Sequence, residues 1–333
     1  MNNKKLKIKP KHYETFNNLS EEITHLTFGD SFNQSVDNLP QNLTHLTFGY
    51  WFNQPVDNLP QNLTHLTFGY EFNQPVDNLP EKLTHLTLGY FFKQSINNLP
   101  KTLTHLTLGH NFYKQVDNLP ESLTHLTFGF GFNKSVNNLP LSLTHLAFGG
   151  SFNQPVDNLP KKLTHLAFNI SFNQPVDNLP ENLTHLTFGY YFNQTVNNLP
   201  LSLTHLTFGV EFNKSVNNLP LSLTHLIFDK QSNFNNKLDN LPKKITYLQL
   251  SKNFQNKITI PNSVKKLFIS CNNDIINNLS DCIEKIFIYF FDEEINKNVS
   301  NLPLTIKKII ISNKKYEKYI KIPFGAILTI RKF

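Results

Sequence analysis

Histidine recurs at intervals of twenty residues through most of the chain, and imidazole can bind a metal, transfer a proton or donate a hydrogen bond. The chain has 333 residues and 13 histidines. Eleven of them occupy one position of a repeated unit: His25, His45, His65, His85, His105, His125, His145, His165, His185, His205 and His225. Self-similarity at such a period is typical of a solenoid, so the repeat has to be interpreted before any histidine is taken as catalytic.

The histidine spacing is compatible with two kinds of chemistry. A zinc or copper site needs three or four ligands that converge on one point, whereas a linear row offers its imidazoles along a line. The alternative is a row of neutral imidazoles that hydrogen-bond along the stack beside threonines such as Thr47. Charged neighbours would repel each other, so we expect histidine pKa values below about 6.5 and a stability that declines as the pH falls through that value.

The elements that carry this row follow from the segment 43–49, which reads LTHLTFG. Leu46 and Phe48 are two residues apart and should lie on one side of a strand, with His45 and Thr47 on the other. The apolar ring of the unit is completed by Leu43, Phe52, Val56 and Leu59. Such a ring can be buried only against copies of itself. We therefore predict a β-rich repeat solenoid with a coil of about 20 residues, one strand per repeat stacked into a parallel sheet, and few or no helices.

The polar residues at the corners of the unit are expected to satisfy the loop backbone. Asn53 and Asn58 repeat in register and are predicted to pair with backbone groups along the stack. The position of Asp57 alternates between Asp and Asn from unit to unit, which argues against a calcium site and favours a side chain that caps its own turn.

Repeat regularity divides the chain into three parts. Residues 1–22 are predicted to be a degenerate capping coil, since Leu6 and Ile8 align with Leu46 and Phe48. Regular repeats follow over residues 23–242. Residues 243–333 keep the apolar skeleton, with coils that begin near Ile245, Val264, Ile283 and Ile306, lose the repeated His and Thr, and end in a short strand around residues 327–330 and a basic cap.

Charge is distributed unevenly, although the net charge is +7. Residues 23–222 hold eight basic and twelve acidic residues, and residues 223–333 hold eighteen basic and nine acidic ones. Because the array has no basic stripe and the chain a single arginine, we expect no nucleic-acid partner. Cys271 and Cys282 form no metal or disulfide spacing. With no signal peptide and no long apolar run, these features favour a reducing, cytoplasmic location without membrane contact.

The two positions that follow Gly49 vary most among the units and carry many aromatic residues over the first coils. Aromatic side chains are favoured anchors in protein interfaces, although a permissive corner could also tolerate any residue. The candidate partner-binding residues are Tyr50, Trp51, Tyr70, Phe91, His45, His65 and His85.

The spacing of Leu43, Leu46 and Phe48 is similar to the opening of a leucine-rich repeat. The unit more closely resembles the FNIP repeat of social amoebae and giant DNA viruses, through the segment 52–56 (FNQPV), the segment 58–60 (NLP) and the segment 63–66 (LTHL). The resemblance implies a leucine-rich-repeat-like binding scaffold, in the host cytoplasm if the chain is viral. Some family members carry an amino-terminal F-box, and none is evident in the 22 residues before the first full unit.

These observations predict a non-catalytic, monomeric scaffold that binds another protein and has no cofactor. No nucleophile, base and orienting group recur together, so the repeat offers no enzyme site. Two alternatives stay open: a purely structural rod or spacer, and metal binding on the histidine row.

Overall fold

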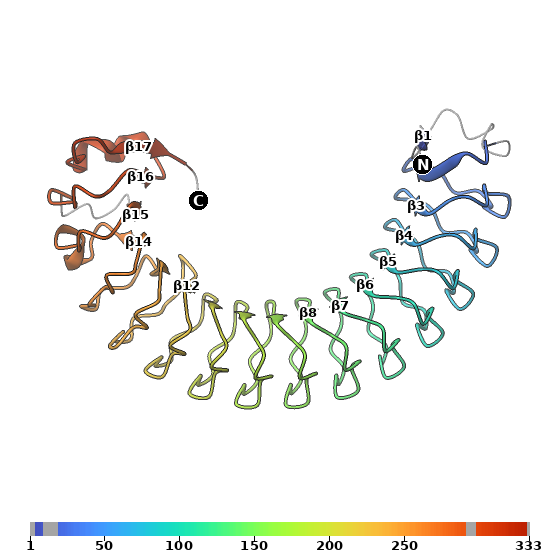
Figure 1. The fold of residues 1–333 in the computed structure, drawn as a ribbon, viewed down its shortest axis with the longest axis horizontal. Helices are drawn as coiled ribbons and strands as arrows, with labels where there is room; N and C mark the ends of the chain where they lie inside the picture. Colours follow the sequence, from blue (N-terminus) through green and yellow to red (C-terminus); the bar gives the residue numbers. More distant parts are fainter. Residues whose placement is uncertain (1–3, 9–18, 291–297, 332–333) are drawn as a thin grey trace. The chain divides into compact units, whose positions relative to one another are not determined.

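A computed structural model describes residues 4–8, 19–290 and 298–331. Contacts along the chain form two compact units, unit 1 over residues 1–170 and unit 2 over residues 171–333. In both units, coils of similar length follow one another, each with a short strand and long loops (Figure 1). The predicted division into 1–22, 23–242 and 243–333, which rests on repeat regularity, stays a prediction.

Unit 1 contains nine described strands that pair in sequence order into a parallel sheet. Their bounds are β1 Lys4–Ile8, β2 Ile23–Phe28, β3 His45–Thr47, β4 His65–Thr67, β5 His85–Thr87, β6 His105–Thr107, β7 His125–Thr127, β8 His145–Ala147 and β9 His165–Ala167. Leu6 of β1 pairs with Leu26 of β2, the residue equivalent to Leu46.

Unit 2 continues the same architecture with strands β10 to β17, again parallel and paired in sequence order. Their bounds are β10 His185–Thr187, β11 His205–Phe208, β12 His225–Phe228, β13 Tyr247–Gln249, β14 Lys266–Ser270, β15 Lys285–Tyr289, β16 Lys308–Ile311 and β17 Ile327–Ile330. Two short 3-10 helices, η2 Asp274–Asn277 and η3 Lys314–Tyr319, interrupt the loops. Both units are therefore β-solenoids with almost no helix, as the sequence predicted.

The core of each coil is the predicted apolar ring. Leu46 and Phe48 are buried on one side of β3, whereas His45 and Thr47 on the other side are half-buried. Leu43 and Phe52 are fully buried, and Val56 and Leu59 are nearly so. Burying one such Phe or Leu side chain stabilises the fold by about 1.5–3 kcal/mol, which a coil obtains only when neighbours cover both of its sides.

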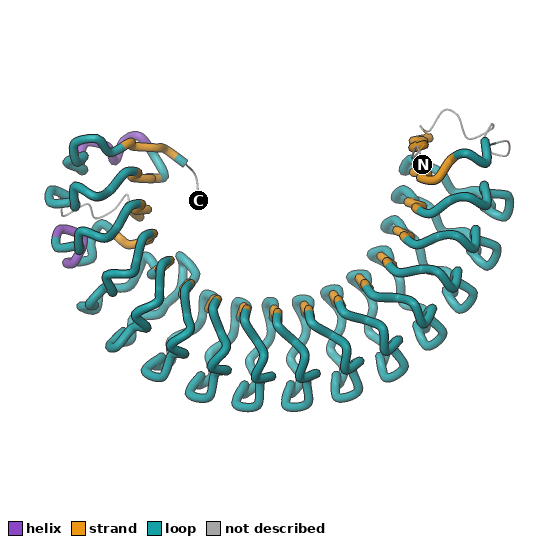
Figure 2. The backbone as a smooth tube through the Cα atoms, viewed as in Figure 1, coloured by secondary structure: helices purple, strands orange, loops and turns teal. Residues whose placement is uncertain are grey.

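Phenylalanine rings stack along each unit on the loop side of the strands. The Phe52 and Phe72 rings are 6.1 Å apart, whereas the His45 and His65 rings on the strand face are 4.1 Å apart. The two rows in unit 2 differ in the same way. The wider spacing on the loop side means that each unit curves, with its strands along the inner side (Figure 2).

Polar ladders connect neighbouring coils at the corners. The backbone N–H of Asn53 donates to Asn33 Oδ1 at 2.9 Å, which confirms the predicted pairing of this row with the loop backbone. Asn58 Nδ2 donates to Asp37 Oδ1 of the preceding coil, also at 2.9 Å. The Asp position therefore links two coils, where the sequence suggested a side chain that caps its own turn.

The glycine that follows most strands of the regular coils lies where two coils approach closely, although Asn169 and Asp229 stand at the same position. A Cβ atom on Gly69 would lie 1.8 Å from the carbonyl oxygen of Gly49, and one on Gly89 would lie 1.8 Å from that of Gly69. The sequence indicated only a corner at this position. The structure assigns the glycine a packing role that links each coil to the one before it.

Candidate functional site

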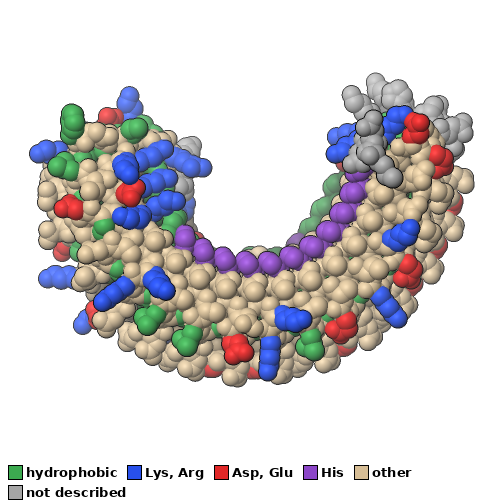
Figure 3. Space-filling model, viewed as in Figure 1, with side chains coloured by type: hydrophobic (Ala, Val, Ile, Leu, Met, Phe, Trp, Pro, Cys, Tyr) green, Lys and Arg blue, Asp and Glu red, His purple; other side chains and the backbone are tan. Residues whose placement is uncertain are grey.

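The repeated histidines form a stacked row on the strand face, here called the histidine row. In unit 1, neighbouring rings lie 4.0 to 4.1 Å apart at interplanar angles of 10 to 14°. In unit 2, the His185, His205 and His225 rings have the same 4.1 Å spacing. Figure 3 shows the histidines of each unit as a purple row along this face. The strands hold them in register because each histidine pairs with the histidine of the next strand.

A threonine hydroxyl fixes the orientation of each imidazole. Thr64 Oγ1 lies 2.9 Å from His65 Nδ1 and 3.1 Å from the carbonyl oxygen of Thr44. That carbonyl already accepts the backbone N–H groups of Thr64 at 2.8 Å and His65 at 3.0 Å. Since a hydroxyl has one hydrogen and a carbonyl oxygen two lone pairs, we assign the hydroxyl hydrogen to Nδ1. The proton of neutral His65 then lies on Nε2.

The same arrangement recurs along the row, so the same assignment places an N–H donor at Nε2 of each imidazole. The Thr Oγ1 to His Nδ1 distance is 2.9 Å at His25, His45, His85, His105, His125, His145, His165, His185 and His205, and 3.0 Å at His225. A partner on this face would therefore meet Nε2–H groups about one strand spacing apart.

The environment of the row favours neutral imidazole. Burial, and to a smaller extent the charges of His65 and His25, lower the pKa of His45 to about 4. Burial also lowers the pKa of His125 to about 4, aided by His105 and His145. The pKa is lowered at these positions too, with burial as the largest cause: His25, His65, His85, His105 and His225. At neutral pH these imidazoles are therefore uncharged.

The geometry of the row does not form a metal site. No group of three or more His, Cys, Asp or Glu side chains able to hold a metal ion occurs among the described residues. Nδ1 of each imidazole lies within hydrogen-bond distance of a threonine hydroxyl, and the nearly parallel rings direct their Nε2 atoms side by side instead of toward one point. Metal binding on the histidine row therefore gains no support from the structure.

A second row, here called the aromatic row, runs through unit 1 five residues after the histidines. Its stacked members are Tyr50, Tyr70, Tyr90, His110 and Phe130, and it also includes Trp51 and Phe91, which pack against the stack from the side. Successive ring centroids lie 4.6, 4.2, 4.1 and 4.8 Å apart, with interplanar angles of 5 to 13°. Trp51 packs edge-on against Tyr50 at 4.7 Å, and Phe91 packs edge-on against Tyr70 at 5.1 Å. The two variable positions after the glycine thus form one connected aromatic surface.

The structure places the predicted residues in two groups. Tyr50, Trp51, Tyr70 and Phe91 come together in the aromatic row, and Trp51 remains 55% exposed. The other group, His45, His65 and His85, is half-buried in the histidine row. The sequence did not show that Tyr90, His110 and Phe130 extend the aromatic row. The alignment of position 50 across all units was the signal, since those residues follow Tyr70 at the same repeat position.

Sequence reasoning also missed a basic row in unit 2. Lys266, Lys285 and Lys308 are paired in register at the strand position that carries histidine in the regular coils. The signal was available, because each of these lysines stands two residues after a predicted coil start, at Val264, Ile283 and Ile306. The sequence interpretation grouped only Lys308 with the basic residues of the chain end.

Short in-register parallel strands, an apolar ring in every coil and stacking along one axis define a leucine-rich-repeat-like solenoid. The FNIP Repeat model matches the following segments: 15–51, 35–71, 52–91, 72–111, 92–131, 114–149, 132–171, 172–197, 195–231 and 234–272. Since these matches tile well over half of the sequence, the chain belongs to the FNIP repeat family.

Solved structures share the fold. The chain is 40% identical to CroV588 of a giant virus, described as a circular leucine-rich-repeat protein, with a TM-score of 0.74 over 94% of this chain and 53% of that one. It therefore spans about half the length of that structure. The functional domain of InlJ from Listeria monocytogenes matches at 14% identity and a TM-score of 0.59, over 87% of this chain and 70% of InlJ.

Toll, from a Drosophila complex with Spatzle, matches at 14% identity and a TM-score of 0.57, over 93% of this chain and 47% of that one. Identities of this size show the fold alone. No curated protein shows significant sequence similarity to the chain. In the part of the chain that the structure describes, no helix has the length and apolar character to cross a membrane.

Proposed function

We propose that the chain is a non-catalytic repeat scaffold that binds another protein through the aromatic row of unit 1. One observation carries this proposal: exposed and half-buried rings stack into a connected surface at the coil positions whose residue types vary most. The apolar ring is repeated because the fold requires it, and no such requirement explains the aromatic residues after the glycine.

The physical properties of the row suit an interface anchor. Trp51 is 55% exposed, and Phe130 is 43% exposed. Tryptophan and tyrosine bury large areas on binding and are enriched among residues that dominate binding energies. Their rings already pack against one another, so a partner would order few additional rotamers when it binds.

The histidine row supplies polar groups on the strand face of the same unit. Its Nε2–H groups are donors, and a protein partner offers backbone carbonyl and carboxylate oxygens as acceptors. His45, His65 and His85 belong to the coils that also carry Tyr50, Tyr70 and Tyr90. A partner that covers these coils could contact apolar rings and hydrogen-bond donors together, as extended solenoid surfaces permit.

The test compares two double variants in quantitative affinity purification from the native cell. Trp51→Ala with Phe91→Ala removes two rings of the aromatic row. Tyr113→Ala with Tyr191→Ala removes two other rings, which are 52% and 53% exposed and lie outside the row. We expect the first variant to lose at least about tenfold in recovery of a partner, since an anchor residue is worth more than about 1 kcal/mol, and the second to bind normally.

Equal recovery by the intact chain and the Trp51→Ala, Phe91→Ala variant would contradict the aromatic row as the binding surface. The partner recovered by the intact chain is then purified, and its direct binding to the intact chain and to both variants is measured. Circular dichroism shows whether all variants remain folded. Loss of binding only in the control variant would also overturn the proposal, because it would place the interface elsewhere.

The structural rod or spacer is the second candidate. No buried side-chain nitrogen or oxygen lacks a hydrogen-bond partner among the described residues, and polar ladders connect successive coils. A stack so completely hydrogen-bonded would also serve as a stiff spacer. If the intact chain recovers no partner under the conditions above, the rod becomes the better explanation.

The same proposal includes a monomeric state, no cofactor and a cytoplasmic location. Cys271 is buried and Cys282 is partly exposed, and neither forms a disulfide. Free thiols are the usual state of cysteine in a reducing compartment. Sedimentation of the purified protein tests the monomeric state.

A further inference from the structure

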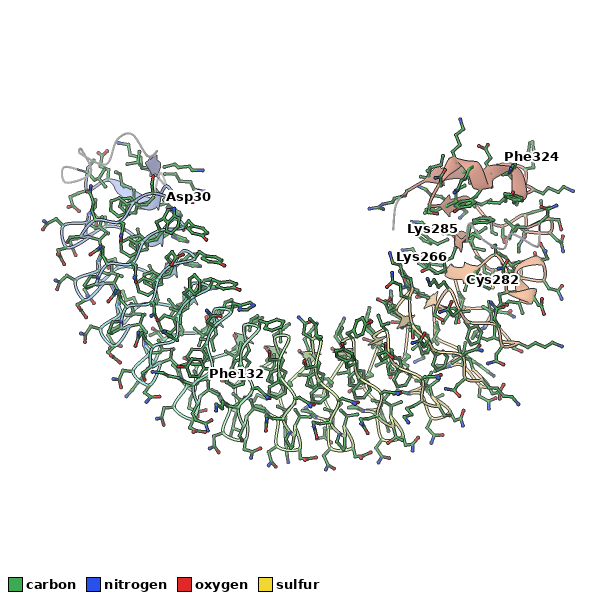
Figure 4. The ribbon with its side chains drawn as sticks, turned by 180° about the vertical axis from the view of Figure 1, so that it is seen from behind. Asp30, Phe132, Lys266, Cys282, Lys285 and Phe324 are labelled. Carbon is green, nitrogen blue, oxygen red and sulfur yellow. The ribbon has the colours of Figure 1, made fainter. Side chains whose placement is uncertain are left out.

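The strand face of unit 2 changes its chemistry along one register position. His225 pairs with Tyr247, Tyr247 with Lys266, Lys266 with Lys285, and Lys285 with Lys308. Neighbouring strands lie about 4.8 Å apart, so the three lysines place cations along roughly 10 Å of the sheet. We call Lys266, Lys285 and Lys308 the lysine row; Figure 4 shows Lys266 and Lys285 as neighbours on this face.

The carboxylate nearest in sequence is engaged by other lysines. Glu284 lies 2.9 Å from Lys307 and 3.7 Å from Lys265. Within the described ranges, no ion pair joins a carboxylate to Lys266, Lys285 or Lys308. The lysine row therefore presents a positive charge that the described part of the chain does not neutralise.

The charges of the row act on one another. Burial lowers the pKa of Lys285, and the charges of Lys266, Lys308 and Arg331 lower it further. Like charges held at strand spacing destabilise each other, and a bound anion removes part of this repulsion. The binding of an anionic ligand would thus be favoured by its attraction to the three lysines and by the reduced repulsion among them.

An aromatic floor supports the lysine stems. Phe268, Phe287 and Tyr289 form a buried cluster with Ile310, and the Phe268 and Phe287 rings stack at 3.7 Å. Lys285 Nζ lies 4.9 Å from the Phe287 ring centroid, within cation–π distance. Apolar stems that pack on such a floor hold their charged ends toward solvent.

We propose that the lysine row, with Arg331 beside it, binds an acidic segment of a partner protein in extended conformation. An extended peptide places side chains of one face about 7 Å apart, so two or three carboxylates fit along the row. This site lies in unit 2 and is additional to the aromatic row of unit 1.

The covered floor favours a peptide over single-stranded nucleic acid. Nucleic-acid strands bind basic grooves whose exposed aromatic rings stack on the bases. Phe268 and Phe287 are each only 8% exposed and stack on one another, so no base can lie on them. Arginine, the side chain that best matches phosphate, occurs once in the chain.

The experiment measures fluorescence anisotropy of a labelled octapeptide of glutamate, with an octapeptide of glutamine as the uncharged probe, at low ionic strength. The row variant carries Lys266→Gln, Lys285→Gln and Lys308→Gln. The control variant carries Lys314→Gln, Lys318→Gln and Lys321→Gln, which removes the same charge from exposed lysines of unit 2. A third variant replaces the three lysines of the row with arginines and so keeps their charge. It serves as the test if the row variant misfolds.

We expect the intact chain to prefer the glutamate peptide, and the row variant to bind it at least about tenfold more weakly. The control variant should lose less than about threefold, because its lysines act only at long range. The arginine variant should retain binding. Equal losses in the row and control variants would overturn the proposal, since binding would then follow net charge alone.

A thymidine oligonucleotide of equal charge is tested with the same variants. If it binds more tightly than the glutamate peptide and through the same lysines, the peptide proposal is overturned in favour of nucleic acid. The Trp51→Ala, Phe91→Ala variant should bind the glutamate peptide normally. This result separates the two proposals, because failure of the aromatic row as an interface leaves peptide binding by the lysine row unchanged.

Discussion

The regular coils of unit 1 and the irregular coils after residue 243 keep the same buried residues and differ in what they expose. Leu46 of β3 and Phe48, which directly follows β3, correspond to Leu267 and Ile269 of β14, and all four are buried. On the strand face, His45 and Thr47 are replaced by Lys266 and Phe268. Stacking therefore requires the apolar ring, and the outward positions are free to carry specific chemistry.

The comparison also explains why near-identity among the regular coils is weak evidence of function. Unit 2 retains parallel pairing after the repeated His and Thr are lost, so the histidine row is not needed to build the sheet. What the regular coils gain is a uniform face of neutral donors beside aromatic rings. The irregular coils present a charged face on a buried aromatic floor.

The largest expected effect separates core from surface within a single coil. Phe132 is fully buried, whereas Phe130, two residues earlier, is 43% exposed (Figure 4 labels Phe132). Phe132→Ala should cost about 3–5 kcal/mol of unfolding free energy, because a ring-sized cavity opens between stacked coils. Phe130→Ala should cost less than about 1 kcal/mol.

Urea denaturation measures this difference, and hydrogen exchange localises it, since a solenoid can open coil by coil. Equal losses in the two variants would show that the aromatic row is part of the structural core, and the proposed division between buried ring and exposed row would be wrong.

The second expected effect is a loss of stability in acid that is concentrated in the regular coils. The pKa of His45 and of His125 is about 4 in the fold, against about 6.5 when unfolded. Because the unfolded chain then binds protons more readily than the folded one, the free energy of unfolding is at its full value above about pH 6.5. It decreases as the pH falls from there toward 4. After solvent screening, each such imidazole should cost on the order of 1 kcal/mol.

Thermal melts between pH 7.5 and 4.5 test this effect, and rate-corrected hydrogen exchange at pH 5 locates it. We expect protection to fall more in β3 to β7 than in β14 to β16, where lysine replaces histidine. Melting temperatures that stay constant across this range, or equal loss of protection in both regions, would contradict the assigned role of burial and repulsion.

Much of the fold could be predicted from the sequence because the twenty-residue period is directly visible in it. Four features follow from sequence patterns with a period of two or twenty residues. They are the apolar ring, the side of the strand on which His45 lies, the alignment of Leu6 and the last strand near Ile327. These patterns determine what must be buried, and burial determines the stacking direction.

The contacts that escaped prediction join residues of different coils. Asp37 accepts from Asn58, and Gly69 allows the backbone of Gly49 to approach, although each pair is about one unit apart in sequence. When one unit is considered alone, Asp and Gly at these positions are explained by contacts within that unit, as a turn cap and a corner. The lysine row was missed although its register follows from the predicted coil starts, because the coil spacing changes after residue 223 and Lys266 and Lys285 no longer recur at the twenty-residue period.

The smallest expected effect concerns the proton position on the histidine row. Thr64→Val removes the hydroxyl that lies 2.9 Å from His65 Nδ1. Without that donor, the imidazole can place its proton on either nitrogen, so the nitrogen NMR shifts of His65 should move from the Nε2–H form toward a mixture. Stability should fall by about 1 kcal/mol or less, the net value of one hydrogen bond. Thr67→Val makes the same substitution within β4, three residues after Thr64, and it should leave the His65 shifts unaltered. Unchanged shifts in Thr64→Val would mean that the hydroxyl donates to the Thr44 carbonyl instead. The regular coils would then present ring acceptors, and their face would differ from the lysine row in hydrogen-bonding character as well as in charge.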